Sequence, residues 1–278
     1  IGRMVKILMP LLGFIMIFMV FYSVLNGDFN KAMKFLFEPD FSNVTSDTFL
    51  QAMGQAFFSL SLGMGSIMAY GAYMPKDQKV VNTSFTVASL DSLVAILAGL
   101  AIFPIIFAFN LEPNSGPGLV FVSMLSAFNQ MEFGFVIGPL FFILLSIAAL
   151  SSSISLLEPG VAFLAEEDIL SRKRAAEILS FFIWILGLGS ALSFNLWADF
   201  NLMPGRNFLD SMDFLANQIL LPFGGMLIAI FVGWFMNKNL ISDELGNANP
   251  LLIRIWRFFV KFIAPLSVAL IFYNAIFG

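Results

Sequence analysis

The sequence predicts an all-α polytopic membrane protein. Of its 278 residues, 59% are hydrophobic and only 12% are charged, which is less charge than a water-soluble domain needs. Phenylalanine alone contributes 35 residues, more than a water-facing surface can tolerate. The chain also contains a series of apolar runs, each of about the 20 residues that a helix needs to cross a bilayer. We therefore expect the lipid bilayer to be the solvent and the main partner of this chain.

Seven such runs follow one another along the chain. All consist mostly of aliphatic and aromatic residues, and several exceed 25 residues, which indicates tilted helices or helices that extend beyond the lipid. The second run differs from the others because small and polar residues occupy its centre. In order, the predicted spans are Met4–Leu25, Phe49–Met74, Ser84–Phe109, Phe133–Leu164, Arg174–Trp197, Asp210–Met236 and Leu251–Phe277.

The positions of lysine and arginine predict the orientation of these spans. If Ile1 lies on the cytoplasmic side, all but three of the 14 basic residues fall at cytoplasmic ends or loops, and the exceptions are Lys31, Lys34 and Arg206. We therefore expect a multi-pass protein of the cell (inner or plasma) membrane with a cytoplasmic start and an extracellular or periplasmic end. The chain opens directly into an apolar run without a cleavage site, so we also expect it to be the later part of a longer protein.

Several kinds of chemistry are excluded by residues that the sequence lacks. It contains no cysteine and no histidine, which rules out disulfides, thiolate or imidazole catalysis, and zinc clusters. It has no phosphate-binding loop of the type G-x-x-x-x-G-K-[ST], and no arginine-rich segment suggests a nucleic-acid partner. We expect neither an enzyme nor an organic cofactor.

The centre of the second predicted span reads Ser59-Leu60-Ser61-Leu62-Gly63-Met64-Gly65. Each glycine costs about 1 kcal/mol relative to alanine inside a helix, and the serines compete for backbone hydrogen bonds. One interpretation is an unwound segment whose backbone groups face a cavity, because irregular backbone at membrane depth is tolerated only there. The other is close packing of small residues between helices, which is common in membranes. The segment by itself slightly favours packing.

A polar stripe runs along the fourth predicted span, where residues recur at helical spacing on one face. Hydroxyl and carbonyl oxygens are the ligands that hard cations prefer, so the stripe is compatible with a cation site. Serines that donate hydrogen bonds to carbonyls of their own helix would also explain the stripe. A carboxylate on the same stripe favours the functional interpretation, because carboxylates in membrane spans usually serve a site. The stripe consists of Ala148, Ser151, Ser152, Ser155 and Glu158.

Asp91 lies inside the third predicted span, with apolar residues on nearly every side. A carboxylate at this depth needs a cation, a basic partner or a proton. Because no lysine or arginine was placed in the middle of a predicted span, a bound metal cation is the best partner within this chain. A protonated Asp91 in a proton relay is the alternative.

Three longer motifs resemble those of the neurotransmitter:sodium symporter family, in its bacterial amino-acid-transporting branch. They are GQAFFSLSLGMGSIMAYGAYMPKDQ (Gly54–Gln78), LSSSISLLEP (Leu150–Pro159) and LDSMDFLANQ (Leu209–Gln218). The resemblance covers essentially the whole chain. It implies that the seven spans correspond to the fifth to eleventh helices of an inverted-repeat fold, with the second span unwound near its middle.

The resemblance also implies how the chain is organised. Residues 1–278 would form a single transmembrane domain, in which residues 4–25 are the last helix of the first repeat, 49–236 the second repeat, and 251–277 an additional final helix. The first four helices of the fold would be absent and would have to be supplied as a partner. In the family, the broken first helix contributes half of every ligand site.

Site residues follow from the resemblance residue by residue. The substrate's ammonium group would be received by backbone carbonyls at the unwound segment, and its side chain would occupy a pocket. Two Na⁺ ions would be held by oxygen ligands, the first by Ser59 and Asp91. Substrate residues would be Phe58, Ser59, Ser61, Met64, Ser152 and Leu156; ligands of the second Na⁺ would be Ala148, Ser151 and Ser152; and gate residues would be Phe58 and Asp213.

The function that the resemblance implies is sodium-coupled symport of a neutral amino acid by alternating access. Members of the family often have Asn at the position of Asp91, and a fixed carboxylate there could replace the chloride that some members need, so we expect chloride independence. Met64 replaces a bulky aromatic residue of many members, and because methionine is adaptable it constrains the choice of substrate only loosely. We expect a hydrophobic or aromatic amino acid. The alternatives are a truncated membrane subunit that does not transport, and a cation channel.

Overall fold

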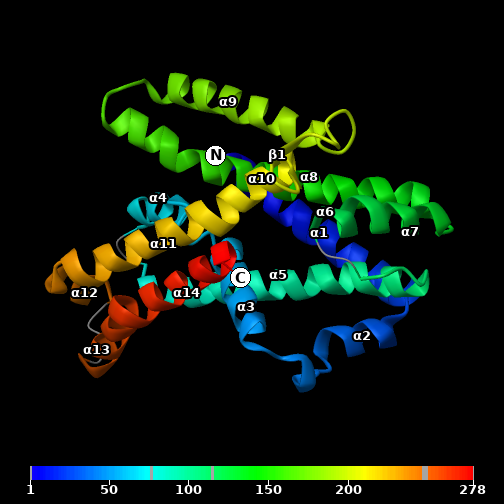
Figure 1. Cartoon of the computed structure of the whole chain (residues 1–278), viewed down its shortest axis with the longest axis horizontal. Helices are drawn as coiled ribbons and strands as arrows, with labels where there is room; N and C mark the ends of the chain where they lie inside the picture. Colours follow the sequence, from blue (N-terminus) through cyan, green and yellow to red (C-terminus); the bar gives the residue numbers. More distant parts are fainter. Residues whose placement is uncertain (1, 76–77, 114–115, 246–249, 278) are drawn as a thin grey trace. The chain divides into compact units, whose positions relative to one another are not determined.

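The computed structural model is almost entirely helical (Figure 1) and describes residues 2–75, 78–113, 116–245 and 250–277. In the described part of the chain, 6 helical segments are long and apolar enough to cross a membrane. They match six of the seven predicted spans to within a few residues, and the protein is accordingly a multi-pass membrane protein. They are Lys6–Asn26, Val80–Ala108, Gly134–Glu166, Arg172–Leu192, Phe208–Phe235 and Leu251–Tyr273.

The remaining predicted span, Phe49–Met74, is divided into two shorter helices. These are α3 (Ser46–Ser59) and α4 (Ser66–Ala72), with 14 and 7 residues. Each helix alone is too short to cross the hydrocarbon core, which needs about 20 residues. The interruption between the two helices therefore accounts for the difference between seven predicted spans and six uninterrupted ones.

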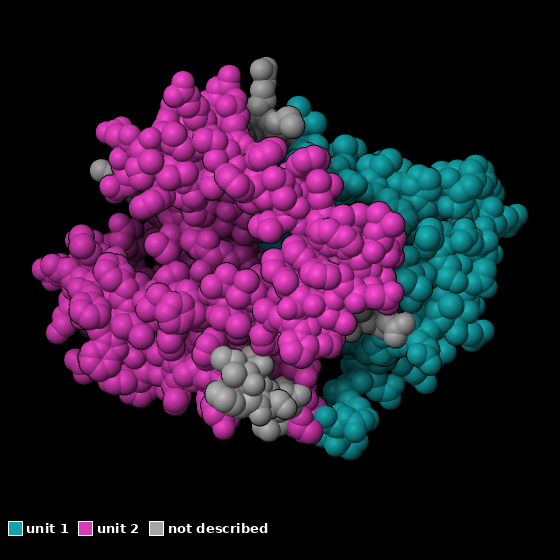
Figure 2. Space-filling model, turned by 45° about the horizontal axis from the view of Figure 1, so that its top comes forward, with its two compact units in different colours: residues 1–43, 89–154 teal, residues 44–88, 155–278 magenta. Residues whose placement is uncertain are grey.

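The chain forms two compact units, drawn in different colours in Figure 2. Unit 1 comprises residues 1–43 and 89–154, and unit 2 comprises residues 44–88 and 155–278. Two helices pass from one unit into the other: α5 (Val80–Ala108) begins in unit 2, and α8 (Gly134–Glu166) begins in unit 1.

Unit 1 has a continuous apolar core to which α1, α5, α7 and α8 contribute. Met19, Ile106 and Met124 are completely buried in it, and Phe128 and Phe141 stack at a tilted angle with ring centroids 5.4 Å apart. Aliphatic and aromatic side chains thus pack these helices together. The elements of unit 1 besides α5 and α8 are α1 (Gly2–Asn26), α2 (Phe29–Phe37), η1 (Phe41–Asn43), α6 (Gly116–Gly118), η2 (Leu119–Ser123) and α7 (Met124–Gln130).

Unit 2 carries the interrupted helix together with the last three predicted spans. Helix α11 packs against α14 and α3, and α14 also packs against α3. A short hairpin of β1 (Asn201–Met203) and β2 (Arg206–Asn207) precedes α10. The other elements are α9 (Arg172–Leu192), α10 (Phe208–Asp213), η3 (Phe214–Leu220), α11 (Leu221–Ile230), η4 (Phe231–Phe235), α12 (Lys238–Glu244), α13 (Pro250–Phe258), η5 (Phe259–Ile263) and α14 (Ala264–Phe277).

Large apolar side chains are widely exposed in unit 2. On α9, for example, Phe181, Phe182 and Trp184 are each more than half exposed. In water such a surface would be a contiguous apolar patch, whereas a helix that faces acyl chains needs this surface. The exposed residues are consistent with the hydropathy of the spans.

One sequence-based statement about the spans is wrong. Lys261 lies ten residues after Leu251 in the final candidate span, Leu251–Tyr273, so a basic residue does occupy the middle of a span. Its ammonium group lies over the ring of Trp234 on η4, 4.0 Å from the centroid. The middle of the spans is therefore not free of basic residues, which removes one reason for preferring a metal cation as the partner of Asp91.

Candidate functional site

The interruption between α3 and α4 is produced by backbone conformation. The α-helical hydrogen-bond pattern ends where the Leu60 amide donates to the Ala56 carbonyl, and it resumes where the Ala69 amide donates to the Gly65 carbonyl. In between, Ser61, Gly63 and Gly65 have φ values of +53°, +86° and +81°. Glycine adopts such values without strain, but L residues rarely do. Since helix ends leave backbone amides and carbonyls without partners inside the helix, the interruption brings such groups into an otherwise apolar segment.

The interruption is held against α11 by a direct approach of two backbones. A β-carbon on Gly63 would lie 2.5 Å from the Leu221 carbonyl oxygen and 2.7 Å from the Gly225 nitrogen. A β-carbon on Gly224 would collide in turn with the Gly63 carbonyl oxygen. Glycine is thus required on both sides of this contact, which we call the glycine contact (Gly63, Gly224 and Gly225). Gly63 is identifiable from the sequence, but its partners Gly224 and Gly225 are not, because a Gly-Gly dipeptide in a membrane span carries no distinctive signal.

The predicted site residues of unit 2 cluster at the interruption. Phe58 and Ser59 form the last turn of α3, and Ser61 and Met64 lie inside the interruption, where both are half-buried. Leu156 is exposed on α8, one residue beyond Ser155, which α4 contacts.

The polar stripe of α8 is part of an unbroken helix. The Ser151 hydroxyl donates to the Ala148 carbonyl at 2.8 Å, and the Ser153 hydroxyl donates to the Ala149 carbonyl at 2.7 Å. Both bonds are those expected of serines that bond back to their own helix, the alternative to a cation site. Ser152 is exposed on the same helix.

The carboxylate that the sequence analysis assigned to this stripe has a basic partner. Glu158 is 5% exposed and forms an ion pair with Arg172, the first residue of α9, whose side chain is 51% exposed. A buried carboxylate is stable when it is paired in this way. The sequence analysis counted Arg172 only among the basic loop residues, because nothing in a separation of 14 residues indicates contact.

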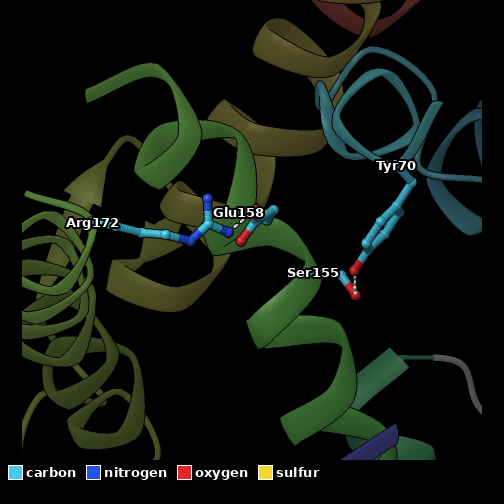
Figure 3. A network of polar contacts seen from close by, with 4 residues as sticks. All are labelled: Tyr70, Ser155, Glu158 and Arg172. Carbon is cyan, nitrogen blue, oxygen red and sulfur yellow. Dashed lines mark hydrogen bonds and ion pairs between the residues drawn. The ribbon is translucent and has the colours of Figure 1, made fainter. Parts of the chain in front are cut away.

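A hydrogen bond joins α4 to the same face of α8. The Tyr70 hydroxyl donates to the Ser155 hydroxyl oxygen at 2.6 Å, three residues before Glu158 (Figure 3). Figure 3 shows the two contacts along α8, with Tyr70 directed towards Ser155 and Arg172 towards Glu158. The helix that follows the interruption is thus tied to α8 by a specific polar contact, which sequence reasoning did not predict.

Asp91 and Asp213 lie outside the interrupted segment in the sequence. Asp91 is half-buried on the unit 1 part of α5. Asp213 is exposed at the end of α10, where its carboxylate accepts a 2.6 Å hydrogen bond from the Asn217 side chain. Beside it, the Arg206 guanidinium lies over the Phe214 ring, 3.7 Å from the centroid.

The oxygen donors suit an alkali cation better than a transition metal. In the described residues there is no group of three or more His, Cys, Asp or Glu side chains that could hold a metal ion. Hydroxyl and carbonyl oxygens such as those of Ser151 and Ala148 are hard ligands, which Na⁺ and similar cations accept. The chemistry of these oxygens is thus compatible with a hard cation.

A multi-pass helical membrane protein with an interrupted helix is an architecture typical of secondary transporters, in which unwound backbone holds substrate and ions. The sequence matches the Sodium:neurotransmitter symporter family over residues 2–278. The chain belongs to this family. Its members named below are transporters, not enzymes, and the family uses Na⁺.

Two bacterial relatives match the whole chain. The uncharacterized sodium-dependent transporter YhdH of Bacillus subtilis (strain 168) is 34% identical over 281 residues, which cover 99% of this chain and 62% of the relative. An uncharacterized sodium-dependent transporter of Haemophilus influenzae is 36% identical over 279 residues, covering 100% of this chain and 61% of the relative. The chain thus spans less than two thirds of the relatives that it matches.

A solved structure is also similar. It is the crystal structure of MhsT in complex with L-phenylalanine, with a TM-score of 0.85 and 42% sequence identity. The match covers 97% of this chain and 62% of MhsT. Similarity at this level shows that the chain shares the fold of this transporter structure.

Proposed function

We propose that the protein performs sodium-coupled symport of a neutral amino acid by alternating access. The observation that carries the proposal is the interruption at residues 60–65, where three residues have positive φ in a segment of membrane-span composition. Membership of a sodium symporter family supports it. In this proposal the segment is the unwound midpoint of a transmembrane helix, because irregular backbone at membrane depth is tolerated only beside a cavity.

The substrate in this proposal is hydrophobic or aromatic. The complex of MhsT with L-phenylalanine supports this choice, as does Met64, whose flexible side chain adapts to apolar ligands of different shape. Carbonyls at the end of α3 would accept hydrogen bonds from the ammonium group of the substrate, and the Phe58 ring would help to close the site on the outer side. The proposed substrate residues are Phe58, Ser59, Ser61, Met64, Ser152 and Leu156.

Two sodium sites are part of the same proposal. Ser59 and Asp91 would bind one ion, and the Ala148 carbonyl with the Ser151 and Ser152 hydroxyls would bind the other. The Ser151 hydroxyl donates to the Ala148 carbonyl at 2.8 Å, as a serine inside a helix does, so membership of a sodium symporter family is what supports the second site. An ion gradient supplies about 2.3 kcal/mol per charge for each 100 mV, which is the energy source for uptake.

The proposed topology has a cytoplasmic start and an extracellular or periplasmic end. The described helices would be the fifth to eleventh of the family fold, and the part of the relatives that this chain does not cover would complete the ligand sites. Asp213 would serve as an outer gate carboxylate, held by its hydrogen bond from Asn217.

The test is uptake by the intact gene product reconstituted in liposomes. Labelled L-phenylalanine and L-leucine are supplied with an inward Na⁺ gradient, and with K⁺ or choline in place of Na⁺. We expect saturable uptake only with Na⁺, and unchanged uptake when gluconate replaces chloride. Flux that does not saturate would indicate a channel, and a folded protein that neither binds nor accumulates amino acid would indicate a subunit without transport activity.

Asp91→Asn tests the sodium site and its chloride independence. Removing the fixed negative charge should lower the apparent Na⁺ affinity or create a chloride requirement, because opposite charges at close range in a low dielectric attract strongly. The measurement is the Na⁺ concentration for half-maximal uptake, with and without chloride. Asp199→Asn, at an exposed loop position, is the matched control. Unchanged Na⁺ affinity together with no chloride effect would contradict the assignment of Asp91.

A further inference from the structure

Three basic residues form one face of the helix run that begins the final span. Arg254 and Arg257 lie on α13, and Lys261 lies on η5, which continues α13 without a break. Their spacing of i, i+3 and i+7 places them on the same side of a helix, within about 10 Å along its axis. We call these three residues the basic stripe.

The described part of the chain provides no carboxylate for the basic stripe. Its ion pairs are Glu158 with Arg172 and Lys173 with Glu177, and neither involves the stripe. Three positive charges next to an apolar segment repel one another and favour an anion. Within the described residues, aromatic rings are the contact that the structure gives to the Lys261 ammonium group.

Lys261 is fixed in place by contacts with η4. Its ammonium group lies 4.0 Å from the Trp234 ring centroid and 5.4 Å from that of Phe262, and the Trp234 indole donates to the Lys261 carbonyl at 3.2 Å. A β-carbon on Gly233 would lie 2.8 Å from the Lys261 α-carbon, so the two π-helical segments touch backbone to backbone. A long side chain that is immobilised in this way loses little further entropy when it binds a ligand.

The rest of the surface of α13 and η5 is apolar and exposed. Leu251 and Phe258 flank the basic stripe, at i−3 and i+4 from Arg254, whereas Leu252 and Phe259 lie on the opposite side, and all four are more than half exposed. Arginines in the first turns of a span, with exposed aliphatic and aromatic residues around them, are typical of a segment that begins at the boundary between lipid headgroups and acyl chains, and Lys261 lies deeper in the same span. The segment therefore offers positive charge to a phosphate and an apolar surface to the chains attached to it.

We propose that the basic stripe binds the headgroup phosphate of an anionic phospholipid. The two arginines match phosphate oxygens through paired N–H donors, and Lys261 adds a point charge. Phe258 and Phe259 contact the acyl chains. The exposed apolar residues favour a lipid over free phosphate, because acyl chains can contact them and a free anion cannot. This site goes beyond symport, and its readout is lipid occupancy, so its failure is separate from failure of the proposed function.

The experiment counts bound lipids by native mass spectrometry of the detergent-solubilised intact gene product. Phosphatidylglycerol is titrated against the wild type and against the double variant Arg254→Gln/Arg257→Gln, with phosphatidylcholine of the same acyl chains as the neutral probe. We expect the wild type to retain phosphatidylglycerol in preference to phosphatidylcholine, and the double variant to need at least tenfold more phosphatidylglycerol for the same occupancy. Lys261→Gln should give a smaller loss.

A matched control removes two charges elsewhere. Lys173→Gln/Arg174→Gln, at the exposed start of α9, should leave phosphatidylglycerol occupancy unchanged. Arg254→Lys/Arg257→Lys keeps the charge and should retain most of the binding even if the glutamine variant folds poorly. Equal losses in both glutamine pairs, no loss in either, or displacement of the lipid by millimolar inorganic phosphate would each overturn the proposal.

Discussion

The interruption after α3 and the polar stripe of α8 are two regions in which small or polar residues interrupt an apolar run, yet they fold differently. In α8 the helix continues through the serines, and Ser151 and Ser153 return their hydroxyls to carbonyls of the preceding turn. After α3 the helix stops, and Ser61, Gly63 and Gly65 take positive φ. Inside a helix, a serine hydroxyl can donate its hydrogen bond to a carbonyl of the preceding turn, so the helix continues. Glycine can adopt positive φ and allows another backbone to approach closely, so the helix can end there. Glycine position, more than polarity, therefore distinguishes the two regions.

Of the substitutions in the two regions, Gly63→Ala should lower the free energy of unfolding the most. Its β-carbon would face both a positive φ and the Leu221 carbonyl at 2.5 Å, so we expect a loss of about 3 kcal/mol or more in the free energy of unfolding. Thermal unfolding of the intact gene product, followed by tryptophan fluorescence, measures the change. Gly71→Ala in α4, where the β-carbon meets nothing within 4 Å, should be neutral or stabilising. Similar melting temperatures for both variants would show that the glycine contact is unimportant.

The ion pair at the end of the α8 stripe should respond asymmetrically to substitution. Arg172→Met leaves the buried Glu158 without its partner and should cost about 2 kcal/mol, less than a fully buried pair because Arg172 is half exposed. Glu158→Gln lets Arg172 turn to solvent and should cost about 1 kcal/mol or less. The double variant should recover part of the larger loss. Equal losses for the two single variants would contradict the asymmetry.

Tyr70→Phe removes the hydrogen bond that connects the two compared regions. Losing one such bond costs about 1 kcal/mol, and Ser155→Ala should cost a similar amount. The double variant should be no worse than either single one, because both remove the same bond. Additive losses in the melting experiment would mean that the two hydroxyls act separately.

Replacing serine by glycine should have opposite signs in the two regions. Ser61→Gly relieves a φ of +53° and should stabilise the protein by about 0.5 to 1 kcal/mol. Ser153→Gly places glycine inside a continuous helix and should destabilise by about 1 kcal/mol. A loss at both positions would show that the Ser61 side chain contributes more than its backbone strain costs.

The sequence predicted the helical spans well because hydropathy over 20 residues is a strong local signal. It also identified Gly63 and Gly65 as unusual, although the local pattern favoured packing over unwinding. Long-range partners were not predictable in the same way. Nothing in the sequence indicates that Arg172 contacts Glu158, 14 residues before it. Nor does it indicate that the Gly224–Gly225 pair contacts Gly63, more than 150 residues before it.

By itself, the sequence determined that this chain lies in a membrane, where its spans fall, and which positions depart from the apolar pattern. A span in lipid must be apolar along its whole length, so the local composition of the sequence is enough to locate it. Only the tertiary structure decided which departures matter. It placed Gly63 against the α11 backbone, Glu158 against Arg172 and Lys261 on Trp234. Each of these contacts depends on the distance between two segments in space, and that distance is set by helix packing rather than by either segment alone.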